Sequence, residues 1–204
     1  MVTYLGAISA MRAEDVSDEL LAKTRHIHVG SFFLQSELRP GLAKLFAHAH
    51  ELGVTTSLDA GWDDTNVWDY GLMEVLKHTD VFLPNEVESA AITKNENVRE
   101  AALKLAEICR ICVVKCGGKG AVCASNGQVY EAATYKAPVR DTTGAGDSFN
   151  AGFLYAFLAG YSLEKSLCYG NACGSLSVAR LGGASSCPNL AEAEKVIATG
   201  VVED

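Results

Sequence analysis

The sequence predicts one α/β domain, covering residues 1–204, with helices on both faces of a mostly parallel sheet that includes one antiparallel hairpin. Helical and strand patterns alternate along the chain, which is typical of parallel sheets. Asn126-Gly127, between two strand-like runs, predicts the hairpin, because both residues of such a turn need positive φ. The 204 residues, 49% of them hydrophobic, suffice to bury one core.

The first half of the chain shows short strand patterns separated by helical ones. The predicted strands cover residues 26–30, 54–58 and 81–83. Apolar residues at helical spacing predict a helix over 42–52, which stops at Gly53, and another over 67–76. Pro84 ends the third strand.

The second half continues the alternation. Asn97 is typical of a helix N-cap, with Glu100 in the position of a capping box, and Ala101, Leu105 and Ile108 form the apolar stripe of that helix. A buried strand and the two hairpin strands are expected at 111–115, 120–125 and 128–133. Helices are expected at about 147–159, 163–179 and 190–198.

Composition and charge exclude several classes of function. The net charge of -8 at pH 7 argues against a nucleic-acid partner, because phosphate-tracking surfaces are usually basic. The sequence has no apolar run of about 18 residues, and its start lacks the pattern of a signal peptide. We therefore expect a cytoplasmic protein without a membrane partner.

The seven cysteines are scattered through apolar stretches, which is typical of reduced thiols rather than of a disulfide framework. We interpret the C-x-x-C of Cys109 and Cys112 as a helix end that leads into a buried strand. Trp62 and Trp68 are expected to be packing residues, although the segment 59–68 lies where a loop on the substrate side could pass.

The segment 141–153, DTTGAGDSFNAGF, carries the strongest signal for chemistry. Gly144, Ala145 and Gly146 have little side-chain bulk and precede a helical stripe, so backbone N–H groups can approach an anion at the helix N-terminus. Asp147, directly beside them, can accept a proton next to that anion.

Other interpretations of this segment stay open at this point. Asp147 could cap the helix, and the glycines could form a tight turn. The segment is not a Walker A loop, and Phe149 occupies the place of the third glycine in a G-x-G-x-x-G.

The whole string DTTGAGDSFNAGFL resembles the C-terminal signature of the ribokinase/PfkB family of carbohydrate kinases. Three further segments follow the order of that family. They resemble its N-x-x-E motif, its ATP loop and its nucleotide-closing loop, at residues 84–88 (PNEVE), 115–121 (KCGGKGA) and 176–188 (LSVARLGGASSCP). The resemblance extends over the whole chain.

The resemblance implies a three-layer αβα ribokinase-like fold and ATP-dependent phosphoryl transfer to a sugar hydroxyl. Asp147 then takes the proton from the attacking hydroxyl, and the N–H groups of Gly144, Ala145 and Gly146 stabilise the transferring phosphoryl group. The residues implied in ATP binding are Lys115, Gly118, Lys119, Gly120 and Asn171. Lys119 could equally be a solvated turn residue.

The resemblance also implies two cation sites. Asn85 and Glu88 organise Mg²⁺ and phosphate through water; taken without the other motifs, the two residues favour a helix cap by Asn85 and a solvated Glu88. The implied K⁺ site consists of Asp141, Thr143, Ser177, Arg180, Gly182 and Ser186, with carbonyl and hydroxyl oxygens as ligands. Asp141 alone could simply hold its loop.

The family's N-terminal region, with the first strands, a small β lid and most sugar contacts, has no counterpart here. We therefore expect the chain to be truncated at the N-terminus, as a fragment, a shortened gene or an engineered piece. The missing strands would leave an apolar sheet edge or face exposed, which favours association, for instance as a homodimer.

The alternatives to an ATP-dependent sugar kinase are a nucleotide-binding protein without turnover and a related kinase that acts on a nucleoside or a vitamin-type alcohol. A dinucleotide oxidoreductase is disfavoured, because the G-x-G-x-x-G and its acidic partner are missing.

Overall fold

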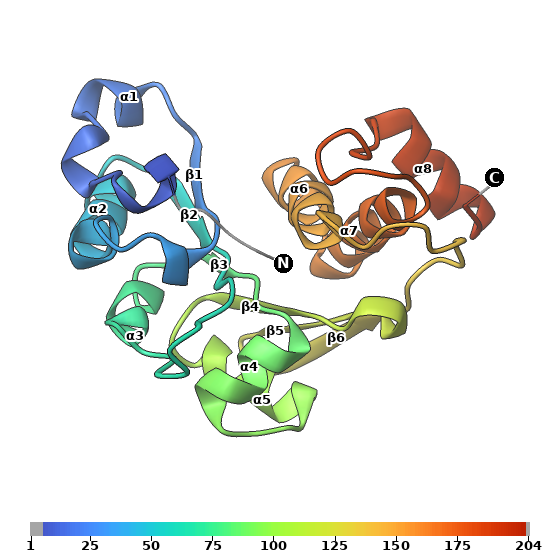
Figure 1. Cartoon of the computed structure of the whole chain (residues 1–204), viewed down its shortest axis with the longest axis horizontal. Helices are drawn as coiled ribbons and strands as arrows, with labels where there is room; N and C mark the ends of the chain where they lie inside the picture. Colours follow the sequence, from blue (N-terminus) through green and yellow to red (C-terminus); the bar gives the residue numbers. More distant parts are fainter. Residues whose placement is uncertain (1–5, 203–204) are drawn as a thin grey trace. The chain divides into compact units, whose positions relative to one another are not determined.

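The structure is a computed structural model that describes residues 6–202, and its helices and strands are labelled in Figure 1. The strands are β1 (His26–Val29), β2 (Thr55–Leu58), β3 (Val81–Phe82), β4 (Ile111–Lys115), β5 (Ala121–Ser125) and β6 (Gln128–Ala132). The helices are α1 (Asp18–Ala22), α2 (Arg39–Glu51), α3 (Leu72–Leu76), α4 (Glu86–Thr93), α5 (Val98–Ala106), α6 (Ala145–Leu158), α7 (Leu163–Val178) and α8 (Leu190–Thr199).

The strands form a six-stranded sheet in the order β1-β2-β3-β4-β5-β6. The pairs β1–β2, β2–β3 and β3–β4 are parallel, and helices connect their strands, as parallel pairing requires. β5 and β6 are joined by Asn126 and Gly127, whose φ angles are 49° and 73°. The predictions of a mostly parallel sheet and of a hairpin turn with positive φ at both residues are confirmed.

The chain divides into two compact units, which we describe separately. The first unit comprises Met1–Val113 and Ala124–Gln128, and the second comprises Val114–Cys123 and Val129–Asp204.

In the first unit, α2 packs its apolar stripe inward, with Leu42, Phe46 and Ala49 fully buried. Asn97 caps α5 as predicted, since its side chain accepts hydrogen bonds from the N–H groups of Arg99 and Glu100. Glu100 does not complete a capping box, because Asn95 Oδ1 accepts the Asn97 N–H. α5 ends at Ala106, so Ile108 lies beyond the helix rather than in its stripe.

The helix predicted over 67–76 is wrong in its first half, because α3 begins only at Leu72. The preceding residues form a loop in which Asn66, Trp68 and Tyr70 have positive φ. The buried carboxylate of Asp63 accepts the Trp68 N–H at 2.7 Å and holds this loop away from helical geometry. Burial raises the pKa of Asp63, but hydrogen bonds from Trp68 and Thr65 outweigh it, so its pKa lies below the usual value.

The C-x-x-C interpretation is confirmed: Cys109 follows α5, Cys112 lies in β4, and both side chains are buried and outside any disulfide. Burial raises the pKa of Cys109 to about 12, so this thiol stays protonated and behaves as a packing residue.

In the second unit, α6 and α7 approach closely through glycine. A Cβ on Gly152 would lie 2.5 Å from the Tyr169 carbonyl oxygen, and one on Gly170 would lie 2.8 Å from the Phe149 ring. The apolar cluster that α6, α7 and α8 share includes Ala156, Tyr169, Ala172, Leu176, Ala193 and Val196. The three predicted helices of this region are confirmed, with α6 beginning two residues earlier than expected.

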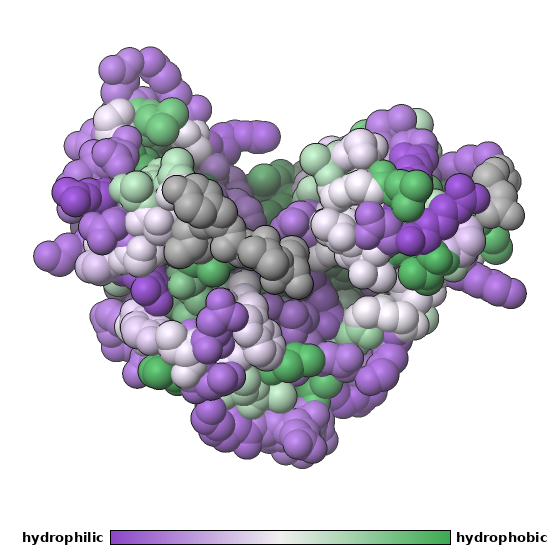
Figure 2. Space-filling view, viewed as in Figure 1, coloured by the Kyte–Doolittle hydropathy of each residue, from purple (hydrophilic) through white to green (hydrophobic). Residues whose placement is uncertain are grey.

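Between residues 6 and 202, no helix is long and apolar enough to cross a membrane. On the face drawn in Figure 2, hydrophobic residues lie in small groups among hydrophilic ones.

We predict that Gly120→Ala strongly destabilises the chain. Gly120 has a φ of 99°, and a Cβ there would lie 2.0 Å from the Ala132 carbonyl oxygen. Backbone strain and the clash together should lower the free energy of unfolding by at least about 2 kcal/mol, measured by urea denaturation. Gly118→Ala is the matched control, because no heavy atom lies within 4 Å of its added Cβ. Equal stability of the two variants would contradict this account.

Candidate functional site

The N-terminus of α6 lacks a side-chain cap. Its N-cap is Gly144, with a φ of 74° and no side-chain hydrogen bond. A Cβ on Gly144 would lie 2.5 Å from the Gly183 carbonyl oxygen, so both its conformation and its neighbour require glycine. The Ala145 N–H donates to the Thr142 carbonyl at 3.3 Å. The N–H groups of Gly144, Gly146 and Asp147 have no acceptor in residues 6–202 and remain for a ligand.

Asp147 lies in the first turn of α6, where its negative charge interacts favourably with the helix dipole. It is exposed, and its carboxylate has no hydrogen-bond or ion-pair partner within the part of the chain that the structure describes. The alternative that Asp147 caps the helix is wrong, because the N-cap position is Gly144.

Lys115, the last residue of β4, extends its ammonium group to the same helix end. Lys115 Nζ donates to Asn150 Oδ1 at 3.2 Å, and a Cβ on Gly146 would lie 3.6 Å from Lys115 Nζ. The positive charge of Lys115 therefore adds to that of the helix N-terminus. Asn150 was missed in the sequence; its position one turn after Asp147 was the available signal.

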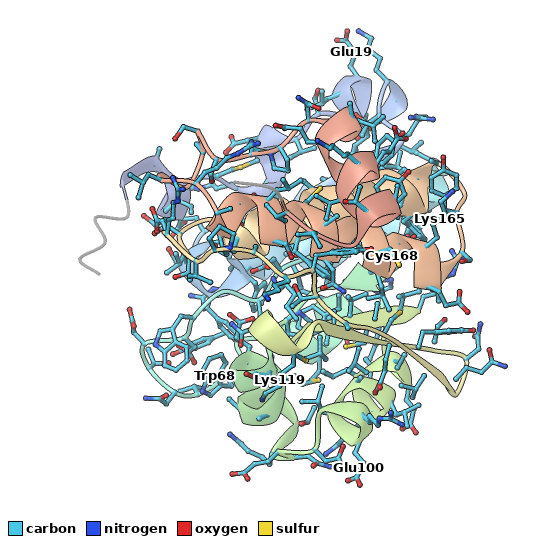
Figure 3. All side chains as sticks on the ribbon, turned by 90° about the vertical axis from the view of Figure 1, so that its right-hand side faces the viewer. Glu19, Trp68, Glu100, Lys119, Lys165 and Cys168 are labelled. Carbon is cyan, nitrogen blue, oxygen red and sulfur yellow. The ribbon has the colours of Figure 1, made fainter. Side chains whose placement is uncertain are left out.

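A cavity of about 440 Å³ lies beside this helix end, entirely within the second unit. Its walls are the β4–β5 turn, the segment after β6, the start of α6 and the inner face of α7. The predicted site residues among its lining are Lys115, Gly118, Gly120, Ala145, Gly146 and Asn171. Gly144, Lys119 and Asp147 do not line it; Lys119, labelled in Figure 3, is exposed on the turn of residues 117–119.

Asn171 is buried on α7, and its amide orientation is defined by two hydrogen bonds. Asn171 Nδ2 donates to the carbonyls of Ala132 at 2.9 Å and Ala133 at 3.2 Å. The amide nitrogen is therefore used by the backbone, which leaves Oδ1 as the atom of this amide that can still bond to a ligand. An acceptor at this place selects a ligand group that donates a hydrogen bond.

Tyr135 also lines the cavity and was not predicted. Burial raises the pKa of Tyr135 to about 12, and the neighbouring Cys168 thiol adds to the shift. The phenol is therefore neutral at pH 7. No motif in the sequence marks Tyr135, because it lies in an irregular segment after β6.

Asp141 links the segment before α6 to the loop after α7. Its Oδ1 accepts the Thr143 N–H and its Oδ2 accepts the Gly182 N–H, each at 2.9 Å. These hydrogen bonds lower the pKa of Asp141. The interpretation that Asp141 holds its loop therefore agrees with the geometry.

The other residues of the implied K⁺ site lie along the same loop. Ser177 Oγ and Ser186 Oγ are 3.0 Å apart and buried. The Ser177 carbonyl accepts the Arg180 N–H, and the Gly182 carbonyl accepts the Ser186 N–H. The Arg180 guanidinium pairs with Glu192 on α8. Each carbonyl oxygen keeps a second lone pair, so the donor set fits a hard monovalent cation.

Asn85 and Glu88 belong to the first unit, where they form a reciprocal capping box at the start of α4. Asn85 Oδ1 accepts the Glu88 N–H and Glu88 Oε2 accepts the Asn85 N–H, both at 2.8 Å. The helix-cap interpretation is confirmed for Asn85, but Glu88 is 6% exposed and therefore not solvated. Within residues 6–202, no group of three or more His, Cys, Asp or Glu side chains is arranged to hold a metal ion.

Comparison with known proteins gives a family match: a model of the pfkB family of carbohydrate kinases matches residues 1–190. The chain is 33% identical over 182 residues to an ATP-dependent ribose-1-phosphate kinase from Halopiger xanaduensis, covering 89% of this chain and 57% of that protein. It is 29% identical over 191 residues to a 5-dehydro-2-deoxygluconokinase from Lacticaseibacillus casei, covering 88% and 58%. The chain thus spans less than two thirds of the length of these relatives.

Solved structures of ribokinases are also similar to this chain. A ribokinase II from E. coli in complex with ATP and Mg²⁺ aligns with a TM-score of 0.83 at 25% identity, covering 93% of this chain and 63% of that one. Arabidopsis thaliana ribokinase complexed with ribose and ATP aligns with a TM-score of 0.76 at 27% identity, covering 92% and 59%. The prediction of a ribokinase-like fold is confirmed.

We predict that Asp141→Ala frees the loop after α7 at neutral pH. A carboxylate whose pKa is lowered on folding stabilises the fold above its unfolded pKa of about 3.9, and this contribution is lost as the pH falls through the lower folded pKa. Hydrogen exchange at the Gly182 amide should therefore be at least about tenfold faster in the variant at pH 7. Hydrogen exchange in α8 is the internal control. Unchanged exchange at Gly182 would show that the hydrogen bond from Gly182 to Asp141 does not hold this loop.

Proposed function

The chain belongs to the pfkB family of carbohydrate kinases, and on that premise we propose that it carries out ATP-dependent phosphoryl transfer to a hydroxyl group of a sugar. The observation that carries the proposal is the uncapped N-terminus of α6. Unpaired N–H groups, the Lys115 ammonium and the partner-free carboxylate of Asp147 converge there beside a cavity of about 440 Å³. Anion binding and proton acceptance are the two requirements of phosphoryl transfer to an alcohol.

ATP occupies the cavity in this proposal, with its phosphates toward α6. Gly118 and Gly120 let the backbone approach the nucleotide, and Lys115 offsets the phosphate charge. The ATP-bound E. coli neighbour supports this assignment. Lys119, exposed on the turn, contacts the outer side of the phosphates or ribose.

Asp147 acts as the general base. It accepts the proton of the acceptor hydroxyl while that oxygen bonds to the γ-phosphorus and the bond to the β-phosphate oxygen breaks, releasing ADP. The N–H groups of Gly144 and Gly146 stabilise the negative charge that spreads over the transferring group, whereas the Ala145 N–H, which the resemblance also implies there, must first leave the Thr142 carbonyl. The absence of a competing partner for Asp147 within residues 6–202 leaves its carboxylate available for this step.

We assign Mg²⁺ to the nucleotide phosphates, with Asn85 and Glu88 contributing through water. When bound, Mg²⁺ neutralises charge on the phosphate oxygens. Glu88 Oε2 accepts the Asn85 N–H, so this cap holds the Glu88 carboxylate in one orientation. We assign K⁺ to the oxygens of Asp141, Thr143, Ser177, Arg180, Gly182 and Ser186.

We further propose that residues 1–204 act as one domain in the cytoplasm and associate as a homodimer. β1 ends the strand order, so its outer edge has no strand partner between residues 6 and 202. An open edge favours pairing with another chain.

A related nucleoside kinase is the second candidate function. Methanocaldococcus jannaschii nucleoside kinase aligns with a TM-score of 0.72 at 27% identity. Phosphate transfer to a panel of sugars and nucleosides separates the two kinases. ATP binding without transfer to any acceptor would instead favour a protein without turnover.

We predict that Asp147→Asn lowers turnover at least about 100-fold, because it removes the general base. The ATP dissociation constant should change less than about threefold, since the amide keeps the size of the side chain. Steady-state kinetics and calorimetry measure the two quantities, in the chain or in a longer natural form if only that form turns over. Glu164→Gln, an exposed first-turn carboxylate of α7, is the control. Near-normal turnover of Asp147→Asn would refute the assignment.

We also predict that ATP binds at least about tenfold more tightly than GTP. Adenine presents an amino donor where guanine presents the carbonyl acceptor O6, and Asn171 offers only its acceptor Oδ1. Calorimetric titration measures both affinities. Inosine triphosphate, which shares O6 with GTP, should bind as weakly as GTP; equal affinities for all three would exclude this contact.

A further inference from the structure

Cys187 is the exposed cysteine among the seven of the chain, all of which lie within residues 6–202. It belongs to the loop after α7, residues 179–189, which leads into α8. Its thiol has a weak contact of 4.0 Å with the Pro188 carbonyl. The other six cysteines are buried or partly buried. An oxidant in solution therefore meets Cys187 first.

The chain that carries this cysteine returns along α7 in the opposite direction, and α8 then packs beside α7 (Figure 1). Ser186 Oγ lies 3.0 Å from Ser177 Oγ, near the end of α7. Further on, Glu194 of α8 accepts the Tyr169 hydroxyl at 3.4 Å, two turns before Ser177 on α7. The residues directly after Ser186 therefore pass the turn of α7 that lies between Ser177 and Tyr169.

Cys173 occupies that turn of α7. It lies four residues from Tyr169 and four from Ser177, so the three share one face of the helix. Cys173 and Cys187 both line a cavity of about 180 Å³ between α6, α7 and the start of α8, entirely within the second unit. This cavity has no lining residue in common with the cavity of about 440 Å³. It has room for a small polar molecule such as hydrogen peroxide.

The surroundings of Cys173 make it the second thiol to react. Its sulfur lies against α6, since a Cβ on Gly152 would lie 2.7 Å from Cys173 Sγ. Burial and, to a smaller extent, the charge of Cys187 raise the pKa of Cys173 to about 11. Such an electrostatic effect requires the two sulfur atoms to be near each other. Cys173 is therefore a protonated, partly covered thiol at pH 7, and Cys187 is the accessible one.

We propose that Cys187 and Cys173 are a modification site at which a hydroperoxide forms a reversible disulfide, which joins the loop after α7 to that helix. The Cys187 sulfur attacks one peroxide oxygen, the O–O bond breaks, and the leaving oxygen departs as water, so that Cys187 becomes a sulfenic acid. The Cys173 sulfur then attacks the Cys187 sulfur, the S–O bond breaks, and the Cys173 proton leaves with that oxygen as water. Two thiols and one hydrogen peroxide thus give one disulfide and two water molecules.

The disulfide acts on a loop that contacts the start of α6. The Gly182 N–H donates to Asp141 Oδ2, and the Gly183 carbonyl contacts Gly144. A covalent bond at Cys187 restrains the other end of this loop. The exposed loop backbone makes the small adjustment that brings the two Cβ atoms to the separation of about 4 Å that a disulfide needs. The inference goes beyond the proposed function, and the bond forms whether or not the chain transfers phosphate.

Peptide mapping of the whole chain tests the proposal without any substitution. The reduced chain is treated with hydrogen peroxide, alkylated in denaturant and digested with trypsin without reductant. Cleavage after Arg180 places the two cysteines on different peptides. We expect mass spectrometry to find these peptides joined by a Cys173–Cys187 bond, with two hydrogen atoms lost, and separated again by dithiothreitol. Sulfinic acid at Cys187 without this bond, or a bond from Cys187 to another cysteine, overturns the proposal.

Two serine variants identify the partner thiol. Cys173→Ser should abolish the joined peptides and leave Cys187 to oxidise further to the sulfinic acid. Cys168→Ser is the matched control, because Cys168 is a partly buried thiol of the same helix and of the same tryptic peptide, on another side of α7. It should keep the joined peptides. Joined peptides that persist in Cys173→Ser overturn the assignment.

Hydrogen exchange measures the restraint of the loop. The amides of Gly182 and Ser186, which donate to Asp141 and to the Gly182 carbonyl, should exchange at least about threefold more slowly in the oxidised chain. Dithiothreitol should restore the original rates. Exchange in α2, in the first unit, is the internal control. Equal exchange at both loop amides before and after disulfide formation overturns the restraint.

Discussion

The candidate active site depends on a helix that begins without a side-chain cap. Among the described residues, five other helices start at a residue whose side chain accepts a first-turn N–H: Ser17, Asn85, Asn97, Ser162 and Asn189. α6 starts at Gly144, which has no side chain to offer. The N–H groups of Gly144, Gly146 and Asp147 therefore keep their hydrogen-bonding capacity, and the positive end of the helix dipole remains available to an external anion. The proposed roles of Lys115 and Asp147 depend on this uncapped helix end.

The same glycine couples the helix end to the loop after α7. Gly144 contacts the Gly183 carbonyl because it lacks Cβ, and Asp141 accepts the N–H of Gly182 next door. The implied cation oxygens and the implied phosphate donors thus belong to one connected structure.

Much of the fold and part of the site could be predicted from local patterns. The Asn126-Gly127 hairpin and the Asn97 cap follow from backbone preferences of single residues, and the start of α6 follows from its small residues and helical spacing. The first half of the helix predicted over 67–76 was wrong, because Asp63, which lies outside the periodic stripe, accepts the Trp68 N–H. The Lys115–Asn150 contact and the amide orientation of Asn171 depend on chain segments that meet only in the folded protein, so no sequence pattern marks them.

The close packing of α6 against α7 has a consequence for how this site can change. Gly152 and Gly170 leave no space for even one methyl group between the two helices, so a larger side chain at either position requires the helices to shift. Such a shift would displace the start of α6, where Asp147 lies. Gly152 and Gly170 thereby help to fix the position of the Asp147 carboxylate, although neither residue lines the cavity of about 440 Å³.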